Sequence, residues 1–329
     1  MKTRASALLG SRLPIVQSGM RWASRAELVS AVSNAGAFGI LSAHTQPDAQ
    51  ALRREIERTR SLTERPFGVN LTLLPGASGV DVEGYVRVVC EERIPVVETA
   101  GGSPARYLDA LKGAGVKVMH KATSVRHAQK AESLGVDAVI IDGFECAGHP
   151  GADDVPGLVL IPAAARALKI PVLAAGGIAD GYGLVAALAL GAEGVCLGTR
   201  FLLTRESPLH AAIKARMLAA GATDTMLVGS RFGDSIRVLR NRTAAEALAL
   251  EAQPATTHGD LLPLIGAPRW MQAMESGDAD DAALPVGQCV GLIDDLPSCA
   301  ELVARMLSQA RDAIEQRLSP LLRAAEAGP

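Results

Sequence analysis

The feature that most restricts the fold is a repeated alternation of short apolar runs and amphipathic stretches between about residues 13 and 203. Such alternation is typical of parallel strands joined by crossover helices. The apolar runs predict eight strands, at residues 15–17, 38–41, 67–71, 96–98, 116–120, 138–141, 172–174 and 194–197. Eight strand–helix units that close on themselves need roughly 200 residues or more, which fits this span better than an open doubly wound sheet. The sequence therefore predicts an α/β protein with a TIM (β/α)8 barrel.

Helical patterns fill the intervals between the predicted strands. They cover residues 24–34, 47–60, 104–113, 124–133, 156–168 and 180–190. Several begin at Ser, Asp or Pro, which helix starts prefer. Gly135 and Gly191 stand where helix C-caps are expected. A late amphipathic stretch, residues 299–317, is expected to close the barrel.

The alternation breaks down between residues 207 and 285, where a helical stretch is followed by two short apolar runs and a segment rich in Pro, Gly and Asp. We interpret residues 207–285 as a smaller inserted α+β domain, with residues 1–206 and 286–329 forming the barrel. Because the insertion leaves from the end of the eighth strand, it is expected to lie as a lid against the carboxyl ends of the strands. Substrate would then bind between the two domains.

Bulk properties exclude several classes of protein. The net charge is −2, from 33 basic and 35 acidic residues without a long charged block, so neither nucleic acid nor an anionic membrane is an expected partner. The N-terminus lacks the apolar run of a signal peptide, and no stretch approaches the roughly 18 apolar residues of a membrane helix. The five cysteines contain no CxxC pair, which indicates neither a disulfide framework nor a metal site. We expect a cytoplasmic protein that binds a small-molecule substrate, and the sequence leaves a homodimer open.

The residues after the seventh and eighth predicted strands are rich in glycine. In a TIM barrel the active site lies at the carboxyl ends of the strands, and Gly176-Gly177 and Gly198-Thr199 fall at two of these ends. Without Cβ atoms, glycines let backbone N–H groups approach a phosphate, and a helix N-terminus adds favourable partial charge. The alternative is that the glycines serve only tight turns. Since no GxGxxG unit for a dinucleotide is evident, we predict that these residues hold the phosphate of FMN.

Polar and small residues also follow the other predicted strands. Gly19 and Met20 are expected to lie against a flavin ring, and Asn70 and Glu98 to bond its polar edge or the ribityl chain. Lys121 would place a cation near the reduced ring and stabilise its negative charge. A structural role is the alternative for each of them. The predicted flavin contacts are Gly19, Met20, Asn70, Glu98, Lys121, Asp142, Ala147 and Gly148.

A loop after the sixth strand carries the candidate base. His149 stands between Gly148 and Pro150, where the backbone is forced out of a helix and the ring is expected to project from the barrel rim. A neutral imidazole there suits a general base or a donor to an anionic substrate, and a surface histidine that caps its own backbone is the alternative. His120 suits either the site or barrel packing. Cys146 lacks an activating neighbour other than His149, so a small packing residue is favoured over a nucleophile.

Assembled, these motifs resemble the nitronate monooxygenase family, formerly called 2-nitropropane dioxygenases. The similarity runs from Leu13 to about Arg317. It implies an FMN-containing barrel with a small second domain, in which His149 is the catalytic base. The segments that carry it are Leu13-Pro14-Ile15-Val16-Gln17-Ser18-Gly19-Met20, Pro66-Phe67-Gly68-Val69-Asn70-Leu71, Asp142-Gly143-Phe144-Glu145-Cys146-Ala147-Gly148-His149-Pro150-Gly151, Ala175-Gly176-Gly177-Ile178-Ala179-Asp180-Gly181 and Gly198-Thr199-Arg200-Phe201.

One branch of that family works as an NAD(P)H:quinone reductase, and two segments resemble it closely. They are residues 68–75 (GVNLTLLP) and 291–295 (GLIDD). This branch would use NADH or NADPH as the electron donor. The loop at residues 76–81 (GASGVD) is small and glycine-rich, where that branch is expected to have a bulkier, proline-containing gate.

The sequence favours an FMN-dependent oxidoreductase that oxidises alkyl nitronates with dioxygen. An FMN-containing NAD(P)H:quinone reductase is the main alternative, followed by an enoyl thioester reductase. A flavin-free lyase or isomerase on a phosphate-binding barrel would share the glycine turns.

Overall fold

The computed structural model describes residues 1–73 and 81–326. Its centre is a closed barrel of eight parallel strands, each paired with the next in chain order and the eighth with the first. The strands are β1 (Ile15–Gln17), β2 (Phe38–Ser42), β3 (Phe67–Thr72), β4 (Val96–Ala100), β5 (Lys117–Ala122), β6 (Ala138–Asp142), β7 (Val172–Ala175) and β8 (Gly194–Leu197). The predicted TIM barrel is therefore confirmed.

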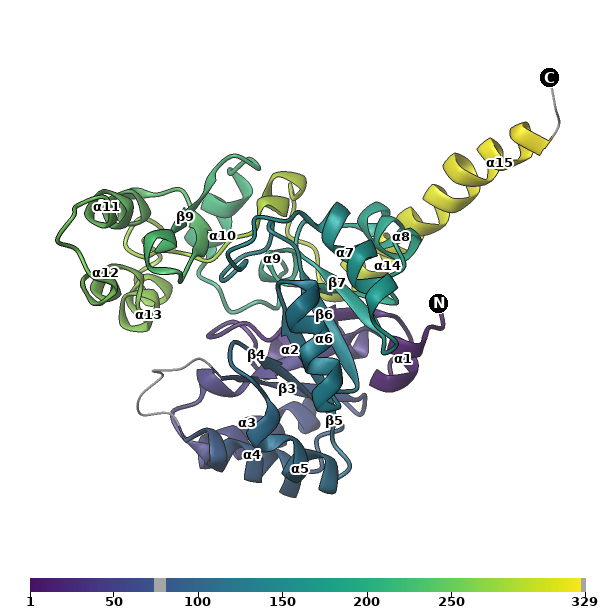
Figure 1. Cartoon of the computed structure of the whole chain (residues 1–329), viewed down its shortest axis with the longest axis horizontal. Helices are drawn as coiled ribbons and strands as arrows, with labels where there is room; N and C mark the ends of the chain where they lie inside the picture. Colours follow the sequence, from purple (N-terminus) through teal and green to yellow (C-terminus); the bar gives the residue numbers. More distant parts are fainter. Residues whose placement is uncertain (74–80, 327–329) are drawn as a thin grey trace.

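Helices surround the barrel (Figure 1). They are α2 (Ala26–Asn34), α3 (Ala49–Leu62), α4 (Val82–Glu91), α5 (Ala105–Gly113), α6 (Val125–Leu134), α7 (Gly157–Ala167) and α8 (Gly181–Ala189). The side chains of Asp48, Ser124 and Asp180 each accept a hydrogen bond from a backbone N–H in the first turn, which fixes where α3, α6 and α8 begin. Gly135 caps α6 at φ 92°, as predicted, whereas Gly191 follows the cap residue of α8 at φ 98°. The short α1 (Arg4–Leu9) was not predicted.

The barrel interior has an apolar floor and a polar upper layer. Successive strand residues point to opposite faces, so every second side chain faces inward. Val96 on β4, Met119 on β5 and Ile140 on β6 all point inward. The residues two positions further along these strands, Glu98, Lys121 and Asp142, therefore also face the interior, at the carboxyl end of the barrel. The interior apolar strand residues are Val16, Phe38, Ile40, Val96, Met119, Ala138, Ile140, Leu173, Ala175 and Cys196.

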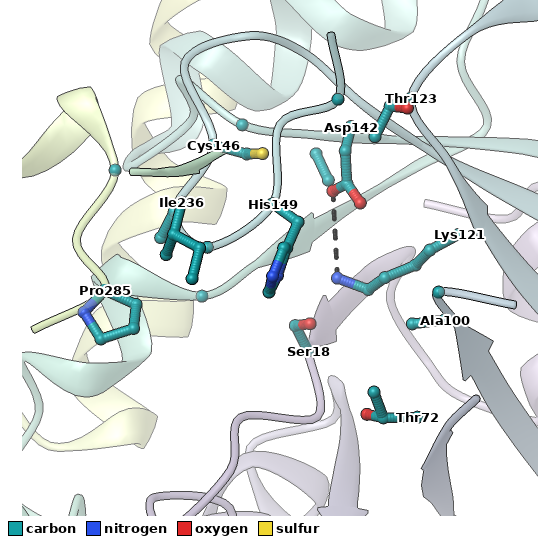
Figure 2. Close-up of a pocket in the computed structure, with 18 of the residues that line it drawn as sticks. Ser18, Thr72, Ala100, Lys121, Thr123, Asp142, Cys146, His149, Ile236 and Pro285 are labelled. Carbon is teal, nitrogen blue, oxygen red and sulfur yellow. Dashed lines mark ion pairs between the residues drawn. The ribbon is translucent and has the colours of Figure 1, made fainter. Parts of the chain in front are cut away.

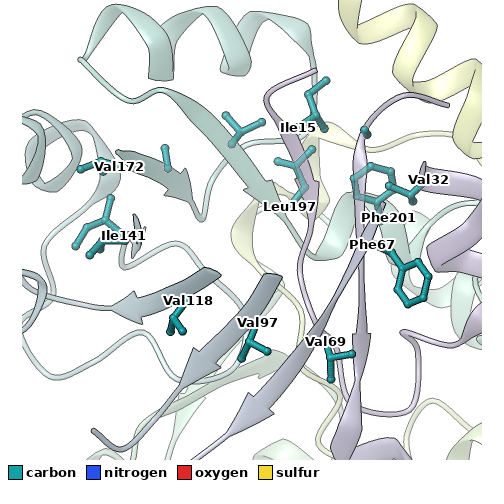
Figure 3. Packing of buried hydrophobic residues seen from close by; sticks show 14 of the residues in the cluster. Ile15, Val32, Phe67, Val69, Val97, Val118, Ile141, Val172, Leu197 and Phe201 are labelled. Carbon is teal, nitrogen blue, oxygen red and sulfur yellow. The ribbon is translucent and has the colours of Figure 1, made fainter. Parts of the chain in front are cut away.

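The larger core lies between the strands and the helices (Figure 3). Outward-facing Val97, Val118 and Ile141 are fully buried there, together with Leu28 of α2 and Leu111 of α5. Full burial of one such side chain stabilises the fold by roughly 1.5–3 kcal/mol. This layer holds the strand ends in fixed positions.

Residues 207–285 form α10 (Ala211–Leu218), the antiparallel strands β9 (Thr225–Val228) and β10 (Ile236–Leu239), α11 (Arg242–Glu251), α12 (His258–Ile265) and α13 (Ala267–Ser276). Their apolar side chains pack with Leu202 and Leu203 after β8 and with Val290 beyond the segment. An antiparallel bridge joins Arg237 of β10 to Gly148 in the loop after β6. The segment therefore contacts the carboxyl ends of the strands, and its action as a lid stays a prediction.

The chain returns to the barrel through α14 (Cys299–Asp312), which packs on α8, and continues through a π-helical turn, η4 (Ala313–Leu318), into α15 (Ser319–Glu326). Gln309 of α14 accepts a hydrogen bond from the backbone N–H of Gly181 at 3.0 Å. Figure 1 shows α15 projecting away from the barrel. All five cysteines are free thiols. Across the described residues, no helix has the length and apolar character to cross a membrane.

Candidate functional site

A cavity of about 1040 Å³ opens at the carboxyl ends of the strands (Figure 2). Ligand pockets typically measure roughly 300–1,000 Å³, so this one has room for a cofactor and a substrate together. Asp234 and Ile236, from the 207–285 segment, contribute to its wall. Glu98 is the predicted site residue that is too deeply buried to line it. The predicted residues that do line it are Gly19, Met20, Asn70, Lys121, Asp142, Ala147, Gly148, His149, Gly176, Gly177, Gly198 and Thr199.

A hydrogen-bonded polar layer lies under this cavity. Glu98 Oε1 accepts hydrogen bonds from Asn70 Nδ2 at 2.8 Å and from the backbone N–H of Gly19 at 3.2 Å. Lys121 Nζ lies 3.9 Å from Asp142 Oδ1. A Cβ on Gly19 would stand 2.2 Å from the Cβ of Asn70, so only glycine fits at this position. Gly19 therefore packs closely against Asn70, and both residues fix the position of Glu98 through hydrogen bonds.

Burial and the Lys121 cation act in opposite directions on the pKa values of the two carboxyl groups in this layer. Burial raises the pKa values of Glu98 and Asp142, and the Lys121 ammonium group opposes both shifts. Burial alone would lower the pKa of Lys121, but the carboxylates of Asp142 and Glu98 outweigh it and raise the pKa above its ordinary value. Lys121 therefore stays a cation at neutral pH, and it faces the cavity with 20% of its side chain exposed.

The glycine turns present backbone donors to the cavity. Gly176 and Gly177 have φ angles of 84° and 73°, a left-handed conformation that favours glycine. A Cβ on Gly198 would meet only Met20 Sδ, at 3.7 Å, so the space in front of this residue belongs to the cavity. Among the described residues, the N–H groups of Gly177, Gly198 and Thr199 find no hydrogen-bond acceptor. Unpaired N–H groups beside open space suit a phosphate.

The Thr199 side chain has a structural partner that the sequence did not reveal. Its Oγ1 accepts a hydrogen bond from the backbone N–H of Gly287 at 3.0 Å. A Cβ on Gly287 would stand 3.0 Å from the carbonyl oxygen of Glu145 and 3.2 Å from the amide nitrogen of Ala147. Gly287 therefore lets the returning chain pack against the loop after β6, and Thr199 keeps its backbone N–H and its hydroxyl hydrogen as donors.

The loop that carries His149 is anchored on both sides. The Glu145 carboxylate accepts hydrogen bonds from the backbone N–H of Gly157 at 3.0 and 2.9 Å. Gly148, at φ 71°, exchanges two backbone hydrogen bonds with Arg237, at 3.1 and 2.6 Å. His149 then projects into the cavity (Figure 2), with 44% of its side chain exposed. The structure thus places the predicted base where a substrate can reach it.

Three residues that sequence reasoning passed over surround this loop. His149 Nε2 lies 3.3 Å from Asp234 Oδ1, and His258 Nε2 lies 3.1 Å from Asp234 Oδ2. The buried Arg237 guanidinium donates to the carbonyl oxygen of Phe144 at 3.0 and 3.2 Å and stacks on the Phe144 ring. None of these residues belongs to a local motif, because their partners lie far away in the chain.

The remaining candidates divide between packing and the cavity wall. His120 lines the cavity, its Nδ1 lies 2.8 Å from Thr99 Oγ1, and burial lowers its pKa to about 4, so it is neutral at pH 7. Burial raises the pKa of Cys146 well above its ordinary value, and the resulting neutral thiol supports the packing role. His44 and His127 also line the cavity. The loop at residues 76–81, where the sequence suggested a missing gate, falls outside the described residues except for Asp81.

The donor set fits a phosphate-bearing flavin. Unpaired N–H groups and open space at Gly198 suit a terminal phosphate, and Lys121 and Asn70 offer polar contacts deeper in the cavity. The described residues gather no group of three or more His, Cys, Asp or Glu side chains suited to a metal ion. Fold and site together define a flavin-type TIM-barrel oxidoreductase.

Comparison with known proteins identifies the family. The nitronate monooxygenase profile matches residues 2–84 and 76–309, so the chain belongs to the nitronate monooxygenase family. It is 33% identical to a nitronate monooxygenase of Pseudomonas aeruginosa, over 94% of this chain and 100% of that protein. It is also 34% identical to the (3aS,4S,5R,7aS)-5-hydroxy-7a-methyl-1-oxo-octahydro-1H-indene-4-carboxyl-CoA dehydrogenase of Rhodococcus jostii, over 94% of this chain and 96% of the relative.

Two solved structures are similar over nearly the whole chain. FabK from Thermotoga maritima superimposes with a TM-score of 0.88 and 36% identity, covering 96% of this chain and 98% of that one. A nitroalkane oxidase from Streptomyces ansochromogenes gives a TM-score of 0.80 and 30% identity, covering 95% and 100%. The Rhodococcus jostii relative is named for a carboxyl-CoA compound and the Pseudomonas aeruginosa relative for a nitronate, so family membership alone leaves the substrate of this chain open.

Proposed function

We propose that this protein is an FMN-dependent oxidoreductase that oxidises alkyl nitronates with dioxygen. The observation that carries the proposal is the position of His149, whose imidazole projects into the same cavity as the Lys121 cation, where it can donate to a nitronate anion or deprotonate the parent nitroalkane. Relatives described as a nitronate monooxygenase and a nitroalkane oxidase, each at least 30% identical over nearly the whole chain, support it.

In this proposal the chain binds FMN through its backbone and its polar layer. The N–H groups of Gly177, Gly198 and Thr199 would hold the phosphate, and Asn70 and Lys121 would contact the flavin deeper in the cavity. FMN, when bound, takes up the electrons that the substrate releases and passes them to dioxygen.

His149 would act as a general base when the substrate is a neutral nitroalkane. Its neutral imidazole takes the proton from the carbon next to the nitro group, leaving a nitronate anion and an imidazolium ion. The Lys121 cation, held by Asp142 and Glu98, stabilises the negative charge that develops in the cavity. A nitronate supplied as such has already lost this proton and needs no base.

A second candidate is oxidation or reduction of an acyl thioester. The Rhodococcus jostii relative, named as a dehydrogenase of a carboxyl-CoA compound, favours it. The third function, NAD(P)H:quinone reduction with FMN, rests on the segments at residues 68–75 and 291–295. The electron donor separates nitronate oxidation, acyl thioester oxidation and the NAD(P)H-dependent functions. Reoxidation of the NAD(P)H-reduced flavin by an enoyl-CoA or by a quinone then separates thioester reduction from quinone reduction.

The test is anaerobic stopped-flow reduction of the bound flavin by ethyl nitronate, nitroethane, an acyl-CoA, NADH and NADPH. The proposal expects the nitronate to bleach the flavin fastest. Faster bleaching by the acyl-CoA or by a nicotinamide nucleotide would transfer the assignment to that function. A preparation without yellow colour that also fails to bind added FMN would contradict every flavin-dependent function.

His149→Ala tests the assigned base. We expect the rate with nitroethane to fall by about 10²–10⁴-fold, the range that general-base catalysis contributes, and the rate with ethyl nitronate to fall much less. His127→Gln, a second cavity-lining histidine, is the matched control and should leave both rates near wild type. Equal losses with both substrates in His149→Ala would remove His149 from proton abstraction.

A further inference from the structure

Asp234 lies between two histidines that come from different parts of the chain. His149 is in the loop after β6, and His258 is the first residue of α12. Asp234 stands in the turn between β9 and β10, with Oδ1 3.3 Å from His149 Nε2 and Oδ2 3.1 Å from His258 Nε2. Both Asp234 and His149 line the cavity. One carboxylate therefore contacts both rings, each through a separate oxygen.

The Asp234 side chain is a carboxylate, which accepts hydrogen bonds and cannot donate them. The side-chain contact with His149 lowers the pKa of Asp234, and burial opposes this shift. The group is thus a carboxylate at neutral pH. A carboxylate beside Nε2 favours the tautomer in which Nε2 carries the proton, and Nδ1 then keeps the lone pair.

The turn that carries Asp234 is fixed to the barrel independently of this contact. Arg237, three residues along, exchanges two backbone hydrogen bonds with Gly148, next to His149. Its guanidinium also donates to Phe144 and to Thr225 Oγ1, the latter at 3.2 Å. The β9–β10 turn and the His149 loop are consequently held side by side by contacts that do not involve Asp234. Removing its charge can therefore change the histidine without detaching the turn.

We propose that Asp234 is a positioning residue for His149, which fixes the ring with Nε2 protonated so that Nδ1 serves as the base toward the substrate. This inference rests on the proposed function of His149 as a base. His258 Nε2 lies near the second oxygen of the same carboxylate. The arrangement follows the common logic in which an acidic group sets the tautomer and orientation of a catalytic imidazole.

The first experiment measures the tautomer directly and needs no substrate. Nitrogen-15 NMR of the flavin-loaded protein, with the His149 signals assigned by their loss in His149→Gln, should show a protonated Nε2 and an unprotonated Nδ1 at alkaline pH. In Asp234→Asn the two nitrogens should move toward a mixture of tautomers. A protonated Nδ1 in the wild type, or the same tautomer in both proteins, would overturn the proposal even if His149 is a base.

The second experiment compares kcat for nitroethane and for ethyl nitronate in Asp234→Asn, Asp234→Glu and His258→Gln. Loss of the partner that orients a metal-bound histidine typically costs about 10–100-fold. We expect a loss of the same order for this imidazole, so Asp234→Asn should lower kcat for nitroethane by about 10–100-fold and leave kcat for ethyl nitronate within about threefold. Asp234→Glu should recover part of the loss because the carboxylate remains. His258→Gln disturbs the same cluster but keeps the carboxylate beside His149, so it should lower kcat for nitroethane less than Asp234→Asn does.

The outcomes distinguish a failure of the positioning role of Asp234 from a failure of the proposed function. If Asp234→Asn and His258→Gln lower both rates equally, the cluster is structural and the positioning role is refuted. If wild-type protein shows no flavin reduction with either nitro compound, the proposed function fails, while the NMR result still decides whether Asp234 sets the tautomer of His149.

Discussion

Gly198→Leu is the sharpest test of the phosphate position. Gly198 has φ −104°, so a side chain brings no left-handed strain, and its Cβ would meet only Met20 Sδ at 3.7 Å. The leucine would therefore extend into the cavity space in front of the N–H groups of Gly198 and Thr199. A hydrogen bond to a charged group contributes about 1.5–3 kcal/mol. Losing both predicts a loss of about 3–6 kcal/mol in FMN binding, on the order of 10²- to 10⁴-fold in Kd.

The assay is the flavin-to-protein absorbance ratio of purified protein, followed by fluorescence titration of the flavin-stripped protein with FMN. Gly113→Leu is the matched control, because a Cβ on Gly113, at the end of α5, meets nothing within 4 Å. Urea unfolding of both variants shows whether either fold is weakened. Wild-type flavin occupancy and affinity in a stably folded Gly198→Leu protein would refute the placement of the phosphate at the end of β8.

Two further predictions concern buried ionisable side chains. Burial lowers the pKa of His120 from 6.5 to about 4. Between these pH values the unfolded chain binds a proton at this imidazole and the folded protein does not. The unfolding free energy should therefore be about 2 kcal/mol lower at pH 5 than above pH 6.5. His120→Gln should show a correspondingly smaller loss in urea unfolding between pH 8 and pH 5; an equal loss would contradict this. Lys121→Met leaves Asp142 without its cation and should lower the unfolding free energy by roughly 3–5 kcal/mol, with part of it recovered in Lys121→Met/Asp142→Asn. If the double variant is no more stable than the single one, the ion pair is not the source of the loss.

Much of the site follows from the local pattern of the chain. The apolar runs predict all eight strands, and the rule that TIM-barrel sites lie at the carboxyl ends of strands selects Lys121, Asp142 and Gly198 from the sequence. Strand alternation is a period-2 property that is visible in sequence, so the inward direction of Glu98 and Lys121 can be derived from their distance to neighbouring apolar residues.

Tertiary structure alone decided which groups act on one another. His149 could be selected from its Gly-His-Pro setting, but its contact with Asp234 and the sharing of that carboxylate with His258 depend on how the 207–285 segment packs on the barrel. The same holds for Thr199, whose hydroxyl oxygen accepts a hydrogen bond from the backbone N–H of Gly287. Periodicity and turn chemistry act between near neighbours in the chain, whereas these contacts join residues from separate elements. They exist only once the hydrophobic cores have fixed those elements in place, because that packing and not any local preference determines the distance between the groups.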